Sequence, residues 1–269
     1  MIVVLSILGF IGKFYLFGAI VAILFGISMA LLSKDENNDK SDSSKQEPAK
    51  QEPAKQEPEL DNSPYIDLGL SIKWASCNLG ASHPWDKGEY YAWGETESKS
   101  EYNTKTYKWY SKKHFWSNQK EISDVKIDKY SYEVISLNDD TYEGDEKVNL
   151  MIEDDAATKQ LGRPWRMPTE KEIVELVYLC EWTPKTIHGR EGFLVVSRYN
   201  GNSIFLPATG IKHDTSISKE WNDGRIGGYL SKRLYPNTQA LGISLYSNHM
   251  YGLDALDRIY GYTIRPVHP

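Results

Sequence analysis

A long hydrophobic run lies near the start of the chain. Residues 14–32 read FYLFGAIVAILFGISMALL and contain no charge. At about 1.5 Å per residue, a helix of this length is about 28 Å long, close to the hydrocarbon thickness of a bilayer. The run predicts a transmembrane anchor, or an uncleaved signal, within residues 1–33. Lys13 before the run favours a C-terminus outside the cytoplasm. A signal peptide cleaved near Ala30 is the alternative.

A polar linker follows at residues 34–63. It contains a five-residue repeat, QEPAK-QEPAK-QEPEL, that begins at Gln46. The repeated prolines lack an N–H group and interrupt helices. The linker also has few apolar side chains, so burial would offset little of the entropy lost on ordering. This composition predicts a disordered spacer, and recognition as a proline-rich ligand is the alternative.

Beyond the linker, apolar residues fall into short runs separated by turn residues. This pattern is typical of short strands and predicts one folded domain at residues 64–269. Asn200-Gly201 is a strong hairpin signal between two of the runs. Strands are predicted at Tyr65–Leu68, Ile72–Cys77, Tyr90–Trp93, Gly192–Ser197, Ser203–Leu206, Ala240–Leu245 and Ile259–Val267.

Two helices interrupt these strands. The pair Asp154-Asp155 precedes AATKQL, and either carboxylate can cap a short helix there. Thr169 and Glu172 have the spacing of a capping box at the start of a second helix. Pro184 predicts the end of that helix. Its apolar positions recur at helical spacing, which indicates one buried stripe: Ile173, Val174, Leu176, Val177 and Cys180.

The charge and cysteine content exclude several classes of protein. There are 31 Lys and Arg against 37 Asp and Glu, so the net charge is −6. A dedicated nucleic-acid binder needs a basic footprint, which this balance argues against. Five Lys and nine Asp or Glu lie in residues 34–64, so most of the acidity belongs to the linker region. Two cysteines exclude a disulfide scaffold and a zinc site of four cysteines.

Seven motifs, in this order, carry a resemblance to a known family. They are YIDLGLSIKWASCNLGA at 65–81, GEYYAWGET at 88–96, DDAATKQLGRPWRMPTEKEI at 154–173, CEW at 180–182, NGNSIFLPATG at 200–210, GYLS at 228–231 and GYTIRPV at 261–267. Residues 65–269 thereby resemble the Fibrobacter succinogenes major paralogous domain family.

The resemblance implies a fold and a location. It implies an α+β domain, similar to the formylglycine-generating sulfatase-modifying domain and to the C-type lectin-like fold, with two helices on a twisted, mainly antiparallel sheet. It also implies secreted or surface-displayed proteins of Bacteroidetes-type bacteria, and no defined reaction. Many members are lipoproteins, whereas this chain has a hydrophobic run and a linker, so periplasmic display from an inner membrane stays open beside surface display.

The two cysteines offer two alternatives. Cys77 lies on a predicted strand and Cys180 at the end of a predicted helix. Outside the cytoplasm they can form a disulfide that closes a loop of about 100 residues, worth about 4 kcal/mol in the chain-entropy model. Two buried free thiols are the alternative.

No catalytic or metal-binding set stands out. The six histidines are scattered, and no HExxH, GxSxG or phosphate-binding loop is present. Formylglycine-generating enzymes use a nearby pair of cysteines that bind copper, and the separation of Cys77 and Cys180 does not match that pair. The pair Asp154-Asp155 could supply acid–base chemistry, but a helix dipole explains it more simply. We therefore expect no cofactor.

Calcium is the one cofactor alternative. Trp221-Asn222-Asp223 is similar to the calcium triplet of carbohydrate-binding C-type lectins, but the partner triplet is missing. The acidic stretch 138–146 lacks the glutamate of an EF-hand loop at Leu150. A polar turn and a solvated loop are the simpler interpretations.

Exposed aromatic and amide side chains predict the binding surface. The insertion 99–146 is rich in Tyr, Trp and Lys, and the C-terminal loops carry Tyr, Asn and His. Aromatic rings bury much area at low entropic cost, which suits glycan or protein recognition. The predicted binding residues are Trp109, Trp116, Trp221, Asn222, Asp223, Tyr235, Asn237, Tyr246, Asn248, His249 and Tyr251.

Together these features predict a non-catalytic binding or adhesion domain on a stalk, anchored in a bacterial envelope membrane through residues 14–32. The expected partner is a glycan or a surface protein, and no nucleic acid. An enzyme evolved on the same fold and a structural envelope component are the alternatives.

Overall fold

The structure is a computed structural model. It describes residue 60 and residues 63–117, 120–131, 145–221, 223–235, 238–248 and 251–269, with the backbone alone for 112–126. The chain divides into two units, and the second, Gln56–Pro269, contains every described residue. The predicted anchor and nearly all of the predicted linker lie outside these ranges. Within them, no helix has the length and apolar character needed to cross a membrane.

Both predicted helices are present. A 3₁₀ turn, η1 (Ile152–Asp154), leads into α2 (Ala156–Leu161), and the side chain of Asp155 accepts a hydrogen bond from the Thr158 N–H at the helix start. At the start of α3 (Glu170–Leu179), Thr169 Oγ1 accepts from the Glu172 N–H, and the Glu172 carboxylate accepts from the Thr169 N–H. The capping box is therefore confirmed.

The predicted end of the second helix is wrong. α3 ends at Leu179, and strand β5 (Cys180–Ile187) follows without a loop. Pro184 lies inside β5 rather than terminating the helix. Within the described sheet β5 pairs with β6 (Arg190–Ser197) on one side only. An edge strand tolerates a proline because one row of its N–H groups has no ladder partner.

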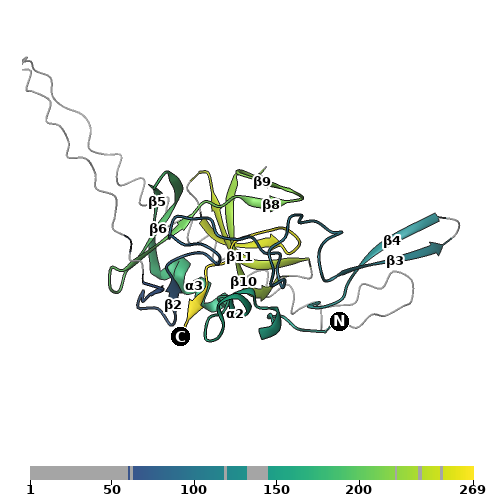
Figure 1. Ribbon diagram of the computed structural model, residues 1–269, viewed down its shortest axis with the longest axis horizontal. Helices are drawn as coiled ribbons and strands as arrows, with labels where there is room; N and C mark the ends of the chain where they lie inside the picture. Colours follow the sequence, from purple (N-terminus) through teal and green to yellow (C-terminus); the bar gives the residue numbers. More distant parts are fainter. Residues whose placement is uncertain are drawn as a thin grey trace, which may run out of the picture. The chain divides into compact units, whose positions relative to one another are not determined.

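The strands form small antiparallel sheets, which confirms the α+β class (Figure 1). One contains β1 (Tyr65–Ile66), β2 (Lys73–Ala75) and β13 (Val267–His268). A second adds β7 (Ser203–Pro207) to β5 and β6. The third contains β10 (Arg225–Leu234), β11 (Gln239–Tyr246) and β12 (Tyr251–Asp257). Two hairpins complete the set: β3 (Tyr110–Ser117) with β4 (Lys120–Ile127), and β8 (Ile211–His213) with β9 (Ser216–Ser218).

The β10–β12 sheet has an apolar core on each face. Tyr229 and Ile243 belong to a core shared with α3, β2 and the β5–β7 sheet. Leu230 and Leu256 belong to a second core, shared with α2 and the 91–93 segment. Successive strand residues face opposite sides of a sheet, so Tyr229 and Leu230 serve different cores. Both faces of this central sheet are therefore covered largely by apolar side chains.

The segment Tyr90–Trp93 differs from its predicted strand. It makes one bridge, from Tyr91 to Tyr262, and belongs to no sheet. Tyr91 and Trp93 face the second core, while Tyr90 faces a third, smaller core with Tyr102 and Tyr107. The aromatic alternation therefore reflects an extended chain buried on both sides.

The insertion 99–146 is not simply an exposed loop. Tyr102, Tyr107 and Tyr130 are fully buried, and the hairpin β3–β4 occupies the middle of the insertion. The two strands extend to one side in Figure 1. Aromatic content alone did not distinguish rings that fill a core from rings that stay exposed.

Candidate functional site

The central β10–β11 hairpin separates the predicted binding residues into two groups. Asp223 and Tyr246 lie at the end where Arg225 pairs with Tyr246. Tyr235 lies at the opposite end, past the pair formed by Leu234 and Ala240, and is 52% exposed. These groups therefore do not form one surface. Asn222, Asn237 and His249 lie outside the described residues.

Four side chains meet at the first end and are called the Arg225 cluster: Asp223, Arg225, Tyr246 and Asp254. The Arg225 guanidinium lies 3.0 Å from the Asp223 carboxylate and 3.1 Å from the Asp254 carboxylate. The Tyr246 hydroxyl donates to Asp254 Oδ2 at 2.5 Å. The cluster is built from three separate segments, because Asp223 precedes β10, Tyr246 ends β11 and Asp254 lies within β12.

Burial and charge act against each other in this cluster. Burial disfavours the charge on Arg225, whose side chain is 13% exposed, but Asp254 and Asp223 outweigh it and raise the pKa of Arg225. Burial and the hydrogen bond to Asp254 raise the pKa of Tyr246. The cluster therefore favours a charged guanidinium on Arg225 and a protonated hydroxyl on Tyr246. Fixed hydrogen-bonding groups of this kind suit recognition of polar ligands.

An aromatic group borders the cluster. The backbone N–H of Trp221 donates to the Arg225 carbonyl at 2.8 Å, so Trp221 adjoins the cluster through the main chain. The half-buried indole of Trp221 lies 5.6 Å from the ring of His213 and 5.4 Å from that of Tyr260. Aromatic faces beside fixed polar groups are a common arrangement for sugar recognition, since the rings cover C–H faces while the polar groups bind hydroxyls.

Two other predicted residues lie near this end with different roles. Tyr251 begins β12 and faces the opposite side of the sheet from Tyr246, where it stacks on Trp182 at 4.4 Å with an interplanar angle of 9°. It therefore belongs to the rim of a core. Asn248 is exposed in the turn after β11.

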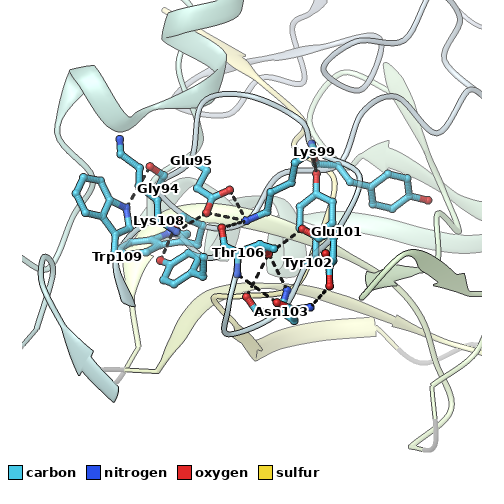
Figure 2. A network of polar contacts seen from close by, with 12 residues as sticks. Gly94, Glu95, Lys99, Glu101, Tyr102, Asn103, Thr106, Lys108 and Trp109 are labelled. Carbon is cyan, nitrogen blue, oxygen red and sulfur yellow. Dashed lines mark hydrogen bonds and ion pairs between the residues drawn. The ribbon is translucent and has the colours of Figure 1, made fainter. Parts of the chain in front are cut away.

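Trp109 lies in a polar network of the 94–109 segment that shares no residue with the Arg225 cluster (Figure 2). Its indole N–H donates to the Gly94 carbonyl at 3.4 Å, and the Lys108 ammonium lies 4.2 Å from the ring centre. In Figure 2 the Lys99 ammonium points to the Glu95 carboxylate and the Thr106 carbonyl, at 2.8 and 2.9 Å. The network ties the 94–109 segment to itself. The side chain of Trp116 is outside the description.

The acidic pair before α2 has two distinct roles that the sequence did not separate. Asp155 caps the helix, whereas Asp154 is buried and accepts hydrogen bonds from Lys129 at 2.5 Å and from the Tyr130 hydroxyl at 2.7 Å. Burial would raise the pKa of Asp154, but these partners and Lys108 outweigh it and lower the pKa. An anchored carboxylate of this kind ties the insertion to α2.

The two cysteines are free thiols in the structure. Cys180 is packed in the first core, and burial raises the pKa of its thiol to about 11. Cys77 is half-buried, and its sulfur lies 3.6 Å from Ser76 Oγ. The disulfide, one of the two alternatives for this pair, is not formed here.

Metal ligands do not gather in the described part of the chain. No group of three or more His, Cys, Asp or Glu side chains there could hold a metal ion. The calcium alternative at Trp221-Asn222-Asp223 includes a residue outside the description, and the Asp223 carboxylate is engaged by Arg225 at 3.0 Å. Most of the acidic stretch 138–146 is also outside it.

Comparison of the chain with protein-family models, with curated protein sequences and with solved structures finds no significant match in any of the three.

Proposed function

We propose that this chain is a membrane-anchored, extracytoplasmic binding or adhesion domain that recognises a glycan or a protein without catalysis. In this proposal residues 14–32 anchor the chain in a bacterial envelope membrane and residues 34–63 act as a stalk. The domain belongs to the Fibrobacter succinogenes major paralogous family and has the C-type lectin-like fold. The seven ordered motifs and the α+β class support this assignment.

The convergence of the Arg225 cluster is the observation that carries the proposal. Predicted binding residues from separate segments, Asp223 and Tyr246, meet at one end of the central sheet, and Trp221 borders them. Arg225 contacts both carboxylates, and the Asp254 carboxylate in turn accepts from the Tyr246 hydroxyl. A preorganised polar group beside half-buried aromatic rings loses little entropy on binding.

A glycan array with the full chain, followed by dissociation constants for the strongest hits, tests the proposal. The substitution Tyr246→Phe removes the hydroxyl that orients on Asp254, and we expect about tenfold weaker binding, equivalent to about 1.4 kcal/mol. Tyr199→Phe is the matched control, because Tyr199 is 64% exposed in the turn before β7. Equal affinities for the parent and Tyr246→Phe would contradict the assignment of this site.

The alternatives predict different results. Turnover of a small molecule by the purified chain would favour an enzyme, while self-association without a ligand on arrays or in pull-downs would favour a structural envelope component.

Protease treatment of intact cells tests the location, because an extracytoplasmic domain on the outer surface is cleaved in the 34–63 stalk. A domain facing the periplasm is cleaved only after the outer membrane is opened.

A further inference from the structure

Strand β12 forms an open edge of the central sheet. It pairs with β11 on one side, through seven consecutive residue pairs without a register shift. On its other side β12 makes no bridge to any part of the chain that the structure describes. Residues 251–255 are all half-buried, so this side of the strand is accessible to solvent along most of its length.

The ladder identifies the backbone groups that face this edge. On the outer side of β10, Thr263 donates to the Gly228 carbonyl and accepts from the Leu230 N–H. Backbone groups of successive residues point to opposite sides of a strand, so the residue between these two bonds β11. The even-numbered residues of β11 then bond β12. The odd-numbered residues Tyr251 and Leu253 therefore direct their N–H and C=O groups outward.

These outward groups are unpaired. No hydrogen bond from a described residue reaches the N–H or the C=O of Tyr251 or Leu253 on this side. The Ala255 N–H is also outward by the same alternation, and it donates to the Asp254 carboxylate at 2.7 Å. A row of unpaired N–H and C=O groups at a sheet edge is a template for one more strand.

β12 also lacks features that commonly block an edge. Bulges, prolines and lysines prevent strands from adding to one another. The sequence of β12, YGLDALD, has neither proline nor lysine, and its ladder has no bulge. By contrast β5, at the edge of another sheet, carries Pro184 and Lys185. Of these two edges, β12 is therefore the one suited to pairing.

One face of an added strand would continue the first core. The side chains of Tyr251 and Leu253 are partly buried at the rim of that core. Side chains of neighbouring strands pack side by side on the same face of a sheet. An apolar side chain of the added strand would therefore cover the exposed part of this rim.

The other face would meet an excess of carboxylates. Asp254 and Asp223 both contact the single guanidinium of Arg225, at 3.1 and 3.0 Å. Lys219 and Glu220, which precede this cluster in the sequence, contribute one formal charge of each sign. The formal balance therefore leaves one carboxylate without a cation of its own, and a basic side chain opposite it would be favourable.

We propose that β12 binds an extended segment of a partner protein by strand addition, with apolar side chains on the core face and basic side chains on the face of the Arg225 cluster. Main-chain hydrogen bonds supply affinity in this mode, and alternate side chains supply specificity. A Cβ at Gly252 would meet no atom within 4 Å, so there is room beside Asp254 for a side chain of the added strand. A second copy of β12 is less suited, because it would bring another Asp254 to the same face. The inference rests on the proposed function, whose protein partner it specifies.

Binding of the full chain, in a non-ionic detergent, to the synthetic peptide Lys-Val-Lys-Val-Lys-Val-Lys tests the chemistry of the partner. As a strand this peptide has lysines on one face and valines on the other. We expect it to bind about tenfold more tightly than Glu-Val-Glu-Val-Glu-Val-Glu, because the glutamates would face Asp254 and Asp223. Equal affinities for the two peptides would contradict the proposed basic partner.

A pair of variants tests the main-chain pairing. Leu253→Pro removes an outward N–H that β11 does not use, and an edge strand tolerates a proline at such a position. It should weaken binding of the lysine peptide about tenfold. Leu253→Ala is the matched control: it also loses the leucine side chain but keeps the N–H, and it should weaken binding less than about threefold. Both should keep the far-ultraviolet circular dichroism of the parent. Equal losses in the two variants, or no loss for Leu253→Pro, would overturn the proposal.

Two measurements on the parent chain locate the site and identify the occupant. Hydrogen exchange with the lysine peptide bound should show added protection in residues 251–255, and protection confined to other segments would contradict the location. Analytical ultracentrifugation without peptide tests a second copy, since a dimer that Leu253→Pro dissociates would show that β12 pairs with itself and would overturn the peptide assignment. Absence of peptide binding would overturn strand addition whatever the glycan array shows, whereas an array without hits would contradict only the glycan part of the proposed function.

Discussion

Arg265 offers the sharpest test of how this fold is held together. It is 1% exposed, and its guanidinium donates four hydrogen bonds. The acceptors are Asn78 Oδ1 at 2.8 Å and the carbonyls of Ala75, Ser76 and Phe205 at 3.1, 2.7 and 2.7 Å. Burial lowers the pKa of Arg265, and its hydrogen-bond acceptors within the described chain include no carboxylate. The side chain therefore joins β2 and the segment after it to β7.

Replacing Arg265 with Met keeps an unbranched apolar stem as far as the position of Nε and removes every donor. A hydrogen bond from a charged donor contributes about 1.5 kcal/mol at the lower end of its range, so four contribute about 6 kcal/mol. Part of this is offset, because Met no longer carries the cost of burying a charge, which is several kcal/mol. We expect Arg265→Met to lower the free energy of unfolding by about 3 to 4 kcal/mol.

Urea unfolding of residues 56–269, followed by tryptophan fluorescence, measures this loss, provided that the m-value is unchanged. Arg198→Met is the matched control: Arg198 is exposed, and we expect its replacement to change the free energy of unfolding by less than about 0.5 kcal/mol. A loss of less than about 1 kcal/mol for Arg265→Met would refute the reasoning, since the four acceptors would then be satisfied without the guanidinium.

Three further predictions concern single positions. Glu172→Gln keeps the capping box but removes the charge paired with an arginine at 2.5 Å, so it should cost about 1 kcal/mol at pH 7. Because folding lowers the pKa of Glu172, this difference should shrink in urea unfolding as the pH falls below about 4. In maleimide labelling of the native protein, Cys77 should react and Cys180 should stay protected, with its thiol pKa near 11; two unreactive sulfurs that label only after reduction would indicate a disulfide. Gly242→Ala should lower the melting temperature by several degrees, because a Cβ there would lie 2.4 Å from the Tyr229 carbonyl oxygen; an unchanged melting temperature would contradict this packing.

Local signals predicted helix starts and hairpins well. The capping box at Thr169 and the cap at Asp155 depend on residues three apart in the chain, so both can be found without tertiary contacts. The hairpin at Asn200-Gly201 depends on a glycine that adopts a positive φ of 75°. The prediction that Pro184 ends a helix failed, because Pro184 lies in a strand. A strand accepts a proline where it forms the edge of a sheet, and sheet position is not visible in the local sequence.

The candidate site was only partly predictable. The sequence selected Asp223 and Tyr246 for their chemistry, but Arg225 and Asp254, which hold them in place, carried no signal in a single sequence. It also grouped Tyr235 with them, although the length of the β10–β11 hairpin separates the two ends.

The sequence by itself determined the hydrophobic run, the repeated linker, the helix caps and the α+β character, because each follows from composition or from neighbours in the chain. The tertiary structure decided which polar groups are buried and paired. Arg265, Asp154 and Arg225 all take partners from segments distant in sequence. The role of a charged side chain depends on its burial and on its hydrogen-bond partners, and these are set only when the chain folds.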